Sequence, residues 1–330
     1  MAALLLAFAT PAFGQSSADP AFAYRNGFWR NLHHTLYAFA SHDPAAGRVR
    51  RVRLSPADVA VRDALAQGEA ATWSEAVRWY ATNLSRRDLL FDDGMVAIGD
   101  AITAVGDGAR PDSAGVPGDL RDILARAAPV YRARFWPAHR QANEAWRVAA
   151  EPLVAEHGSA VAARLSRLFG VAWPDGPIEV ALDAYANSAG AYTSLEPTRI
   201  TVATSDESYQ GQAAFEMLMH EAGHALVGPL RERLAALVAA ETARPGANAA
   251  ALRRDLWHEI LFYMVGQVAA ETMPGYVPYA DRNELWHLAW PGPDREALAR
   301  HLDPYLAGRT SLDAALTALV RDLAATPARQ

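Results

Sequence analysis

The stretch EMLMHEAGHALVG (residues 216–228) contains two histidines four residues apart, with a glutamate directly after the first. On an α-helix, side chains four residues apart lie on one face, with their Cβ atoms about 5–6 Å apart. Two imidazoles in that arrangement can reach one Zn²⁺ at about 2.0–2.1 Å. The surrounding residues are largely apolar, and polar side chains buried in such a helix need partners. The pattern therefore predicts a metal site at His220 and His224.

Glu221 has a different predicted role because it follows His220 by one residue. One step along a helix rotates a side chain by about 100°, which takes Glu221 out of direct contact with the metal. It can still meet a water at the metal. A zinc ion lowers the pKa of such a water towards about 7, and a nearby carboxylate can take its proton. Glu221 is thus the predicted general base.

A catalytic zinc site normally has three protein ligands and one water, so a third ligand is expected. The segment AALRRDLWHEILFYMVGQVAAE (residues 250–271) has the periodicity of a strong helix and carries three candidates, His258, Glu259 and Glu271. His258 shares its helical face with apolar residues, which indicates that it points inward. Glu259 lies on a mixed face. We expect His258 to be the third ligand, with Glu259 and Glu271 as alternatives.

The rest of the chain predicts a mostly helical α+β fold. Apolar residues recur at three- and four-residue steps over about residues 22–168. Between 173 and 205 the pattern changes to β-branched and aromatic alternation, in PIEVALDAYA (177–186) and AYTSLEPTRITVATS (191–205). Helical periodicity returns at Gln212. We therefore expect a small mixed or antiparallel sheet of about three strands directly before the motif helix.

Three regions are expected along the chain: a signal peptide at 1–14, a helical region at 15–170 and a catalytic region at 171–330. The opening MAALLLAFATPAFGQSS has an apolar stretch followed by a small-x-small cleavage pattern before Gln15, although no Lys or Arg precedes it. Export to the periplasm or the medium is the expectation, and a plain apolar N-terminal helix is the alternative.

Composition excludes several kinds of site and partner. The chain has no cysteine, which excludes disulfides, thiolate zinc sites and cysteine nucleophiles. A net charge of −6 gives no reason to expect nucleic acid as a partner, and the basic run RVRRVR (48–53) is expected to be a solvated linker. Beyond the N-terminus no stretch reaches about 18 uninterrupted apolar residues, so no membrane span is expected.

The HEAGH helix, preceded by the strand-like RITVATS and followed by a helix with a candidate ligand, resembles the zincin metallopeptidases. The layout is similar to that of gluzincins. The metzincin pattern would need glycine and histidine where this chain has Val227 and Leu230. More narrowly, HEAGHAL with DLWHEILFYMVG resembles a group of poorly characterised bacterial zincin-like proteins with an LWH helix. The resemblance covers about residues 175–272.

This resemblance implies specific roles. His220 and His224 would be zinc ligands, Glu221 the base and His258 the third ligand, a position at which most gluzincins have glutamate. The strand before the motif helix, Ile200 to Ser205, would form the edge of the cleft and pair with an extended substrate. A donor for the oxyanion is also expected. The candidates for this donor are Tyr263, Tyr276, Tyr279 and His287.

Two further groups of polar residues have ordinary structural interpretations. His33 and His34 are adjacent and so lie on different helix faces, which favours an amphipathic helix over a metal pair. His139, Asn143 and Trp146 lie on one helical stripe, which could line a cleft or pack between domains.

The sequence thus predicts an exported zinc-dependent hydrolase, specifically a metallopeptidase that acts on a peptide or protein substrate. One alternative is a zincin-fold protein that binds metal or peptide without turnover. The other is a non-peptidase zinc amidase or esterase. The sequence does not specify the substrate, the oxyanion donor or the oligomeric state.

Overall fold

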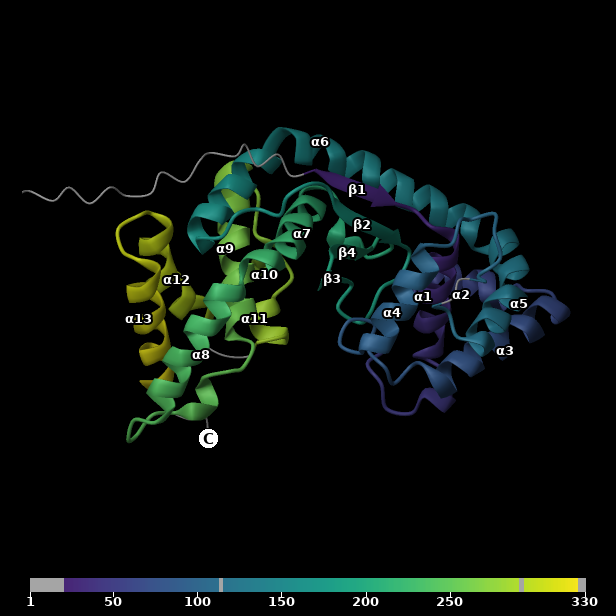
Figure 1. Cartoon of the computed structure of the whole chain (residues 1–330), viewed down its shortest axis with the longest axis horizontal. Helices are drawn as coiled ribbons and strands as arrows, with labels where there is room; N and C mark the ends of the chain where they lie inside the picture. The colour runs from purple at the N-terminus through teal and green to yellow at the C-terminus, as the bar shows by residue number, and fades with distance from the viewer. Residues whose placement is uncertain (1–20, 113–114, 291–293, 326–330) are drawn as a thin grey trace, which may run out of the picture.

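The computed structural model describes residues 21–112, 115–290 and 294–325. It confirms a mostly helical α+β fold with one small mixed sheet (Figure 1). The predicted signal peptide lies outside the described residues. Within them, no helix combines the length and apolar composition needed to cross a bilayer.

The sheet has four strands in the order β1-β2-β4-β3. Their bounds are β1 Phe22–Arg25, β2 Ile178–Asp183, β3 Ala191–Leu195 and β4 Thr198–Ala203. β1, β2 and β4 run parallel, and β3 pairs antiparallel with β4. The sequence predicted about three strands and assigned residues 22–25 to a helical region. That assignment is wrong because β1 is four residues long and its pairing partner is more than 150 residues away.

Alternation along the strands gives the sheet two different faces. Val180, Ile200 and Val202 belong to the apolar core that includes helix α7 (Gln212–Gly223). On the opposite face, Asp183 and Thr201 contact helix α1 (Phe28–Ala40). The sheet therefore separates the motif helix from the N-terminal helices.

The N-terminal helices form a core of their own on that second face. After α1 come the 3-10 turn η1 (Pro44–Ala46) and helices α2 (Pro56–Asp63), α3 (Gln67–Asn83), α4 (Asp93–Thr103) and α5 (Gly118–Arg134). Helix α6 (Trp136–Phe169) follows, and Figure 1 shows it running past the sheet from this group to the C-terminal helices. It contributes residues to both cores.

The C-terminal half surrounds α7 with further helices. Its remaining elements are η2 (Glu207–Tyr209), η3 (His224–Leu226), α8 (Gly228–Thr242), η4 (Ala249–Ala251), α9 (Leu256–Thr272), α10 (Tyr279–Arg282), α11 (Leu285–Leu288), α12 (Asp294–Leu306) and α13 (Leu312–Ala325). Helix α9 packs against both α7 and α6. Helix thus resumes at Gln212, as the sequence predicted.

Helix α1 is buried on every side, which differs from the amphipathic helix expected there. Its two adjacent histidines have separate partners. His33 Nδ1 lies 2.8 Å from the Tyr80 hydroxyl, and His34 Nδ1 lies 2.9 Å from an oxygen of Asp183. The Nδ1 atoms of the two rings therefore have different hydrogen-bond partners, one on α3 and one on β2.

An ion pair joins α1 to the sheet. Arg30 Nε lies 2.9 Å from Asp183 Oδ2, and the same guanidinium donates to the Thr201 hydroxyl at 2.7 Å. Burial alone would raise the pKa of Asp183, but His34 and Arg30 outweigh burial and lower it below its ordinary value. Removing one partner from such a buried ion pair strongly destabilises the folded protein, because the other charge stays buried without compensation.

We expect Asp183→Asn to lower the free energy of unfolding at pH 7 by about 3–5 kcal/mol, because Arg30 would remain buried without its counter-charge. The depressed pKa of Asp183 stabilises the fold above the unfolded-state pKa of about 3.9, and this contribution is lost as pH falls through the folded-state value. Urea unfolding of wild type and variant should therefore give a difference that narrows below about pH 4. Glu75→Gln, which breaks the exposed pair with Arg126, is the matched control and should change stability little. An equal loss in both variants would contradict the prediction.

Candidate metal centre

Helix α7 carries the motif, and every one of its residues from Ala213 to Gly223 is buried. The helix ends at Gly223, and His224 begins turn η3 with its backbone still in the right-handed helical region. The four-residue spacing therefore keeps His220 and His224 on one face. A Cβ atom added at Gly223 would lie 3.0 Å from Leu261 of α9, so the glycine allows the two helices to approach closely.

That close approach brings His258, in the first turn of α9, to the motif. The Nε2 atoms of His220 and His258 are 3.2 Å apart, and one ligand atom from each of the three histidines lies within 4.8 Å of the others. Two nitrogens bound tetrahedrally to one zinc at 2.0–2.1 Å are about 3.4 Å apart. Among the described residues this is the one cluster of three or more potential ligands of this kind.

The two alternative third ligands lie elsewhere. Glu259 is fully buried, and its Oε1 accepts hydrogen bonds from Arg253 at 2.8 and 3.0 Å. Glu271 is exposed at the far end of α9, where it faces Arg164 at 3.9 Å. The structure therefore brings His258 to the motif, and neither glutamate joins it.

The electrostatics favour neutral imidazoles. Burial is the main cause of lowered pKa values in all three: His220 falls well below its ordinary value, His224 to about 3 and His258 to about 4. Repulsion between protonated neighbouring imidazoles would add to this effect at His220, and Arg231 adds to it at His224. Neutral imidazole is the form that binds a metal ion. Three converging neutral nitrogens are a donor set that fits Zn²⁺.

Glu221 lies beside this cluster, with only 4% of its surface exposed. Its Oε2 accepts a hydrogen bond from the Thr193 hydroxyl at 2.7 Å and lies 3.8 Å from His224 Nε2. The other oxygen, Oε1, has no hydrogen-bond partner among the described residues. It is also not completely buried, because it is not among the enclosed side-chain atoms that lack a partner. Burial raises the pKa of Glu221 to about 7, and the Thr193 hydrogen bond acts in the opposite direction. A carboxyl group with such a pKa can both accept and return a proton near neutral pH.

Thr193 and the aromatic residues around the cluster were not among the site residues predicted from the sequence. Thr193 is in β3, and its position beside Glu221 depends on the sheet order. The rings of Trp257, Phe262 and Trp290 contact the three imidazoles. We call these three residues the aromatic collar. Phe262 had a local signal because it lies four residues after His258 on the same helical face, whereas Trp290 had none.

The edge strand differs from the one predicted. Ile200 to Ser205 was expected to form the edge of the cleft, but β4 lies between β2 and β3 and is interior. The edge is β3. The reason is that the β3–β4 hairpin joins the sheet through its second strand, which pairs in parallel with β2.

The predicted oxyanion donors are engaged away from the cluster or exposed. The Tyr263 hydroxyl donates to Asp303, the Tyr276 hydroxyl lies beside Glu216, and the Tyr279 hydroxyl is 3.0 Å from Ser208 Oγ. His287 is exposed in α11. None of the four forms a hydrogen bond to the three histidines or Glu221 within the described parts of the chain.

The polar stripe on α6 packs between the two halves of the molecule, which agrees with the second of its two expected roles. His139 Nε2 lies 3.0 Å from both carboxylate oxygens of Asp58, and Asn143 donates to the Leu182 carbonyl at 2.9 Å. Trp146 Nε1 donates to the Tyr209 carbonyl at 2.6 Å.

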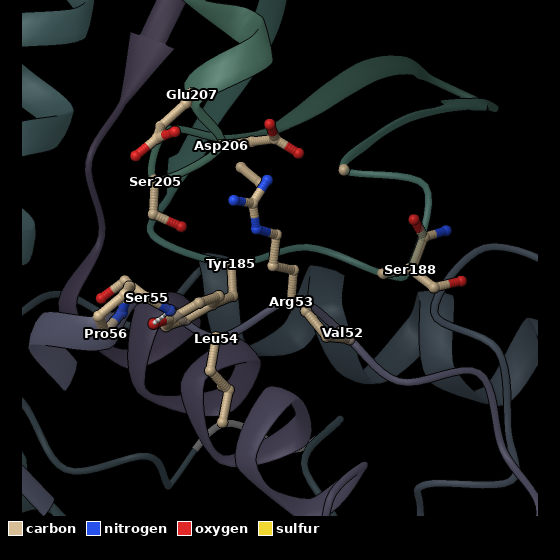
Figure 2. A pocket seen from close by; sticks show the side chains of 13 residues that line it. Val52, Arg53, Leu54, Ser55, Pro56, Tyr185, Ser188, Ser205, Asp206 and Glu207 are labelled. Atoms are coloured by element: carbon tan, nitrogen blue, oxygen red, sulfur yellow. Dashed lines mark hydrogen bonds between the residues drawn. The ribbon is translucent and has the colours of Figure 1, made fainter. Parts of the chain in front are cut away.

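A separate pocket lies at the carboxyl ends of β2 and β4, against the segment that includes the basic run 48–53. Figure 2 shows Arg53 reaching towards Asp206, while Ser188 and Ser205 lie on the surrounding loops. The Tyr185 hydroxyl at its base is already bonded to Asp58 and to the Ser55 amide. The charged side chains that line this pocket are of both signs. The three-histidine cluster lies elsewhere and is the better candidate for a catalytic site.

Comparison with protein-family models, curated proteins and solved structures finds no match to this chain. The distances, burial and charges of the three-histidine cluster therefore carry the functional proposal.

We expect His258→Ala to lose stoichiometric zinc, because two imidazoles remain where a stable site needs three protein ligands. Glu259→Gln should retain zinc but unfold at lower temperature, because Arg253 loses its buried partner. Metal analysis of the purified variants by mass spectrometry, with thermal unfolding of each, measures both effects. Zinc loss in Glu259→Gln with zinc retained in His258→Ala would reverse the ligand assignment.

Proposed function

We propose that this protein is an exported zinc-dependent hydrolase that acts as a metallopeptidase. The observation that carries the proposal is the convergence of three imidazoles beside one buried carboxylate. Zn²⁺ would be held by His220, His224 and His258. A protein that only bound metal would have no need for Glu221 at this position, which supports turnover over simple binding.

When bound there, Zn²⁺ would supply a water of lowered pKa and polarise the carbonyl of the scissile bond. Glu221 would accept the proton of that water through Oε1, which has no hydrogen-bond partner among the described residues, and return it to the leaving amine. Thr193 holds the other oxygen, Oε2, so the carboxylate keeps one orientation. The three imidazoles stay neutral and keep their lone pairs for the metal.

Within the described chain no strand pairs with the outer side of β3, and this edge supports a peptide as the substrate. The Gly190 carbonyl accepts a hydrogen bond from the Ala203 amide, so Tyr192 and Ser194 are the next residues bonded to β4. In an antiparallel pair the intervening residues direct their backbone groups away from the partner strand. Thr193 and Leu195 therefore offer amide and carbonyl groups to an added strand.

Thr193 thus belongs to the edge strand and also contacts the proposed base, Glu221. Its backbone faces the free edge, and its hydroxyl holds Glu221 at 2.7 Å. A peptide paired with this edge would lie next to the three histidines. This proximity favours an extended peptide over a small amide or ester that has no strand to pair.

We expect Glu221→Gln to retain zinc and to lower kcat/KM for peptide cleavage by about 10²–10⁴-fold, because glutamine cannot accept the proton. A peptide library incubated with wild type and variant, with cleavage read by mass spectrometry and zinc measured in parallel, tests this. Treatment with a chelator should abolish wild-type cleavage, and added Zn²⁺ should restore it.

If the wild-type protein does not bind stoichiometric zinc, the proposed function is wrong. Wild type that holds zinc but cleaves no better than Glu221→Gln would identify a binding protein. Cleavage of small esters or amides with peptides left intact would identify the non-peptidase hydrolase.

Thr193→Val should keep zinc but lower kcat by about 10- to 100-fold, because the carboxylate of Glu221 loses the bond that orients it. Thr193→Ser, which keeps the hydroxyl, is the matched control and should remain within a few-fold of wild type. Steady-state kinetics on one cleaved peptide measures both. A valine variant with wild-type kcat would show that Thr193 does not position the base.

A further inference from the structure

The described residues give the three histidines none of the hydrogen bonds that usually orient metal ligands. In most metal sites a ligating imidazole donates its second N–H to a carboxylate, a carbonyl or a water. Here Nδ1 of His220 is enclosed and has no hydrogen-bond partner within the described chain. The ring nitrogens of His224 and His258 likewise receive no second partner from described residues, since the one hydrogen bond is between His220 and His258. Within the described residues, the Nδ1 side of His220 is therefore held by packing contacts rather than by an acceptor group.

Aromatic rings contact all three imidazoles. The ring of Phe262 stacks on His220, with centroids 3.7 Å apart and planes at 28°. Trp257 meets His224 edge to face at 5.6 Å, and Trp290 meets His258 in the same way at 5.9 Å. Each imidazole therefore has its own contact in the aromatic collar, and the contact of Phe262 is the closest.

Phe262 is itself held on several sides. It lies four residues after His258 on α9, and their ring centroids are 5.0 Å apart. Tyr279 stacks near-parallel to it at 6.3 Å, and Trp290 contacts it at 5.4 Å. Glu216 in turn anchors Tyr279 by accepting its backbone amide at 2.8 Å. The position of Phe262 is thus determined by three elements rather than by α9 alone.

The face of a benzene ring carries the negative part of its quadrupole and attracts positive charge. A dication bound at Nε2 would draw electrons from the imidazole and make that ring more positive. The Phe262 face would then attract His220 more strongly in the metal-bound form than in the free form. A contact that is stronger in the metal-bound form than in the metal-free form shifts the binding equilibrium towards the bound form, and so it increases the affinity for the metal.

We propose that Phe262 is a positioning residue for the metal centre: its ring orients His220 and supports the metal-bound imidazole electrostatically, in place of a hydrogen-bond acceptor. The proposal rests on metal binding by the three histidines, which is part of the proposed function, and it does not depend on turnover.

Fluorinated phenylalanines at position 262 test it, because fluorine withdraws electrons from the ring face with little change in size. The full-length protein would carry phenylalanine, 4-fluoro-, 3,5-difluoro- or pentafluorophenylalanine there, and the Kd for Zn²⁺ would be measured by chelator competition. We expect Kd to rise stepwise with fluorination, by about 2- to 30-fold over the series. Phe262→Leu, which removes the ring, should weaken Zn²⁺ binding by about 10- to 100-fold.

Phe215 provides the matched control. It is fully buried in the same helix as His220, and its ring contacts His157 outside the metal centre. The same fluorination series at position 215 should leave the Kd for Zn²⁺ unchanged. Thermal unfolding of the metal-free proteins should be the same across the series at position 262, which separates the effect on the metal from an effect on the fold.

A constant Kd across the fluorinated series would overturn the proposal, even if Phe262→Leu binds zinc weakly, since the ring would then act by packing alone. Failure of the proposed function gives a different result. In that case wild type and His220→Ala would bind Zn²⁺ equally weakly, and both proposals would fall together.

Discussion

The burial of the motif end of α7 is the constraint on which the rest of the site depends. His220 and Glu221 are only 1% and 4% exposed, and polar groups in such a place must have partners. The Thr193 hydroxyl meets Glu221, and the imidazole of His258 meets His220. Both partners come from other elements, so the edge strand and α9 have to be in place before the helix end can be buried. Gly223 and Gly266 favour this packing, because an added Cβ would lie 3.0 Å from Leu261 at the first position and 2.8 Å from Pro278 at the second.

The small sheet connects this site to the N-terminal helices without sharing its chemistry. One face packs against α7, and the other holds the Arg30–Asp183 pair. β3 takes part in both because its side chains alternate: Thr193 reaches Glu221, while Tyr192 accepts a hydrogen bond from Arg30. The N-terminal helices therefore support the position of the edge strand through a rigid polar contact, and the edge strand in turn orients the proposed base.

Local patterns predicted the elements whose stabilising contacts lie close in sequence. The motif helix starts at Gln212, as expected from the return of helical periodicity there. Prediction failed where pairing is distant. The strand at 22–25 has no local signal because its hydrogen bonds go to residues 178–181, and the edge strand was misassigned because strand order depends on how a hairpin joins the sheet.

By itself, the sequence determined the fold class, the motif helix and the pair of histidines on one helical face, because these follow from spacing of three to four residues. Only the tertiary structure decided which of His258, Glu259 and Glu271 meets that pair. It also decided that Thr193 contacts Glu221 and that aromatic rings contact the three imidazoles. The physical reason is that a helical face specifies a direction but not a neighbour. The neighbour depends on how closely α9 and β3 approach α7, and that distance is set by packing across the whole core.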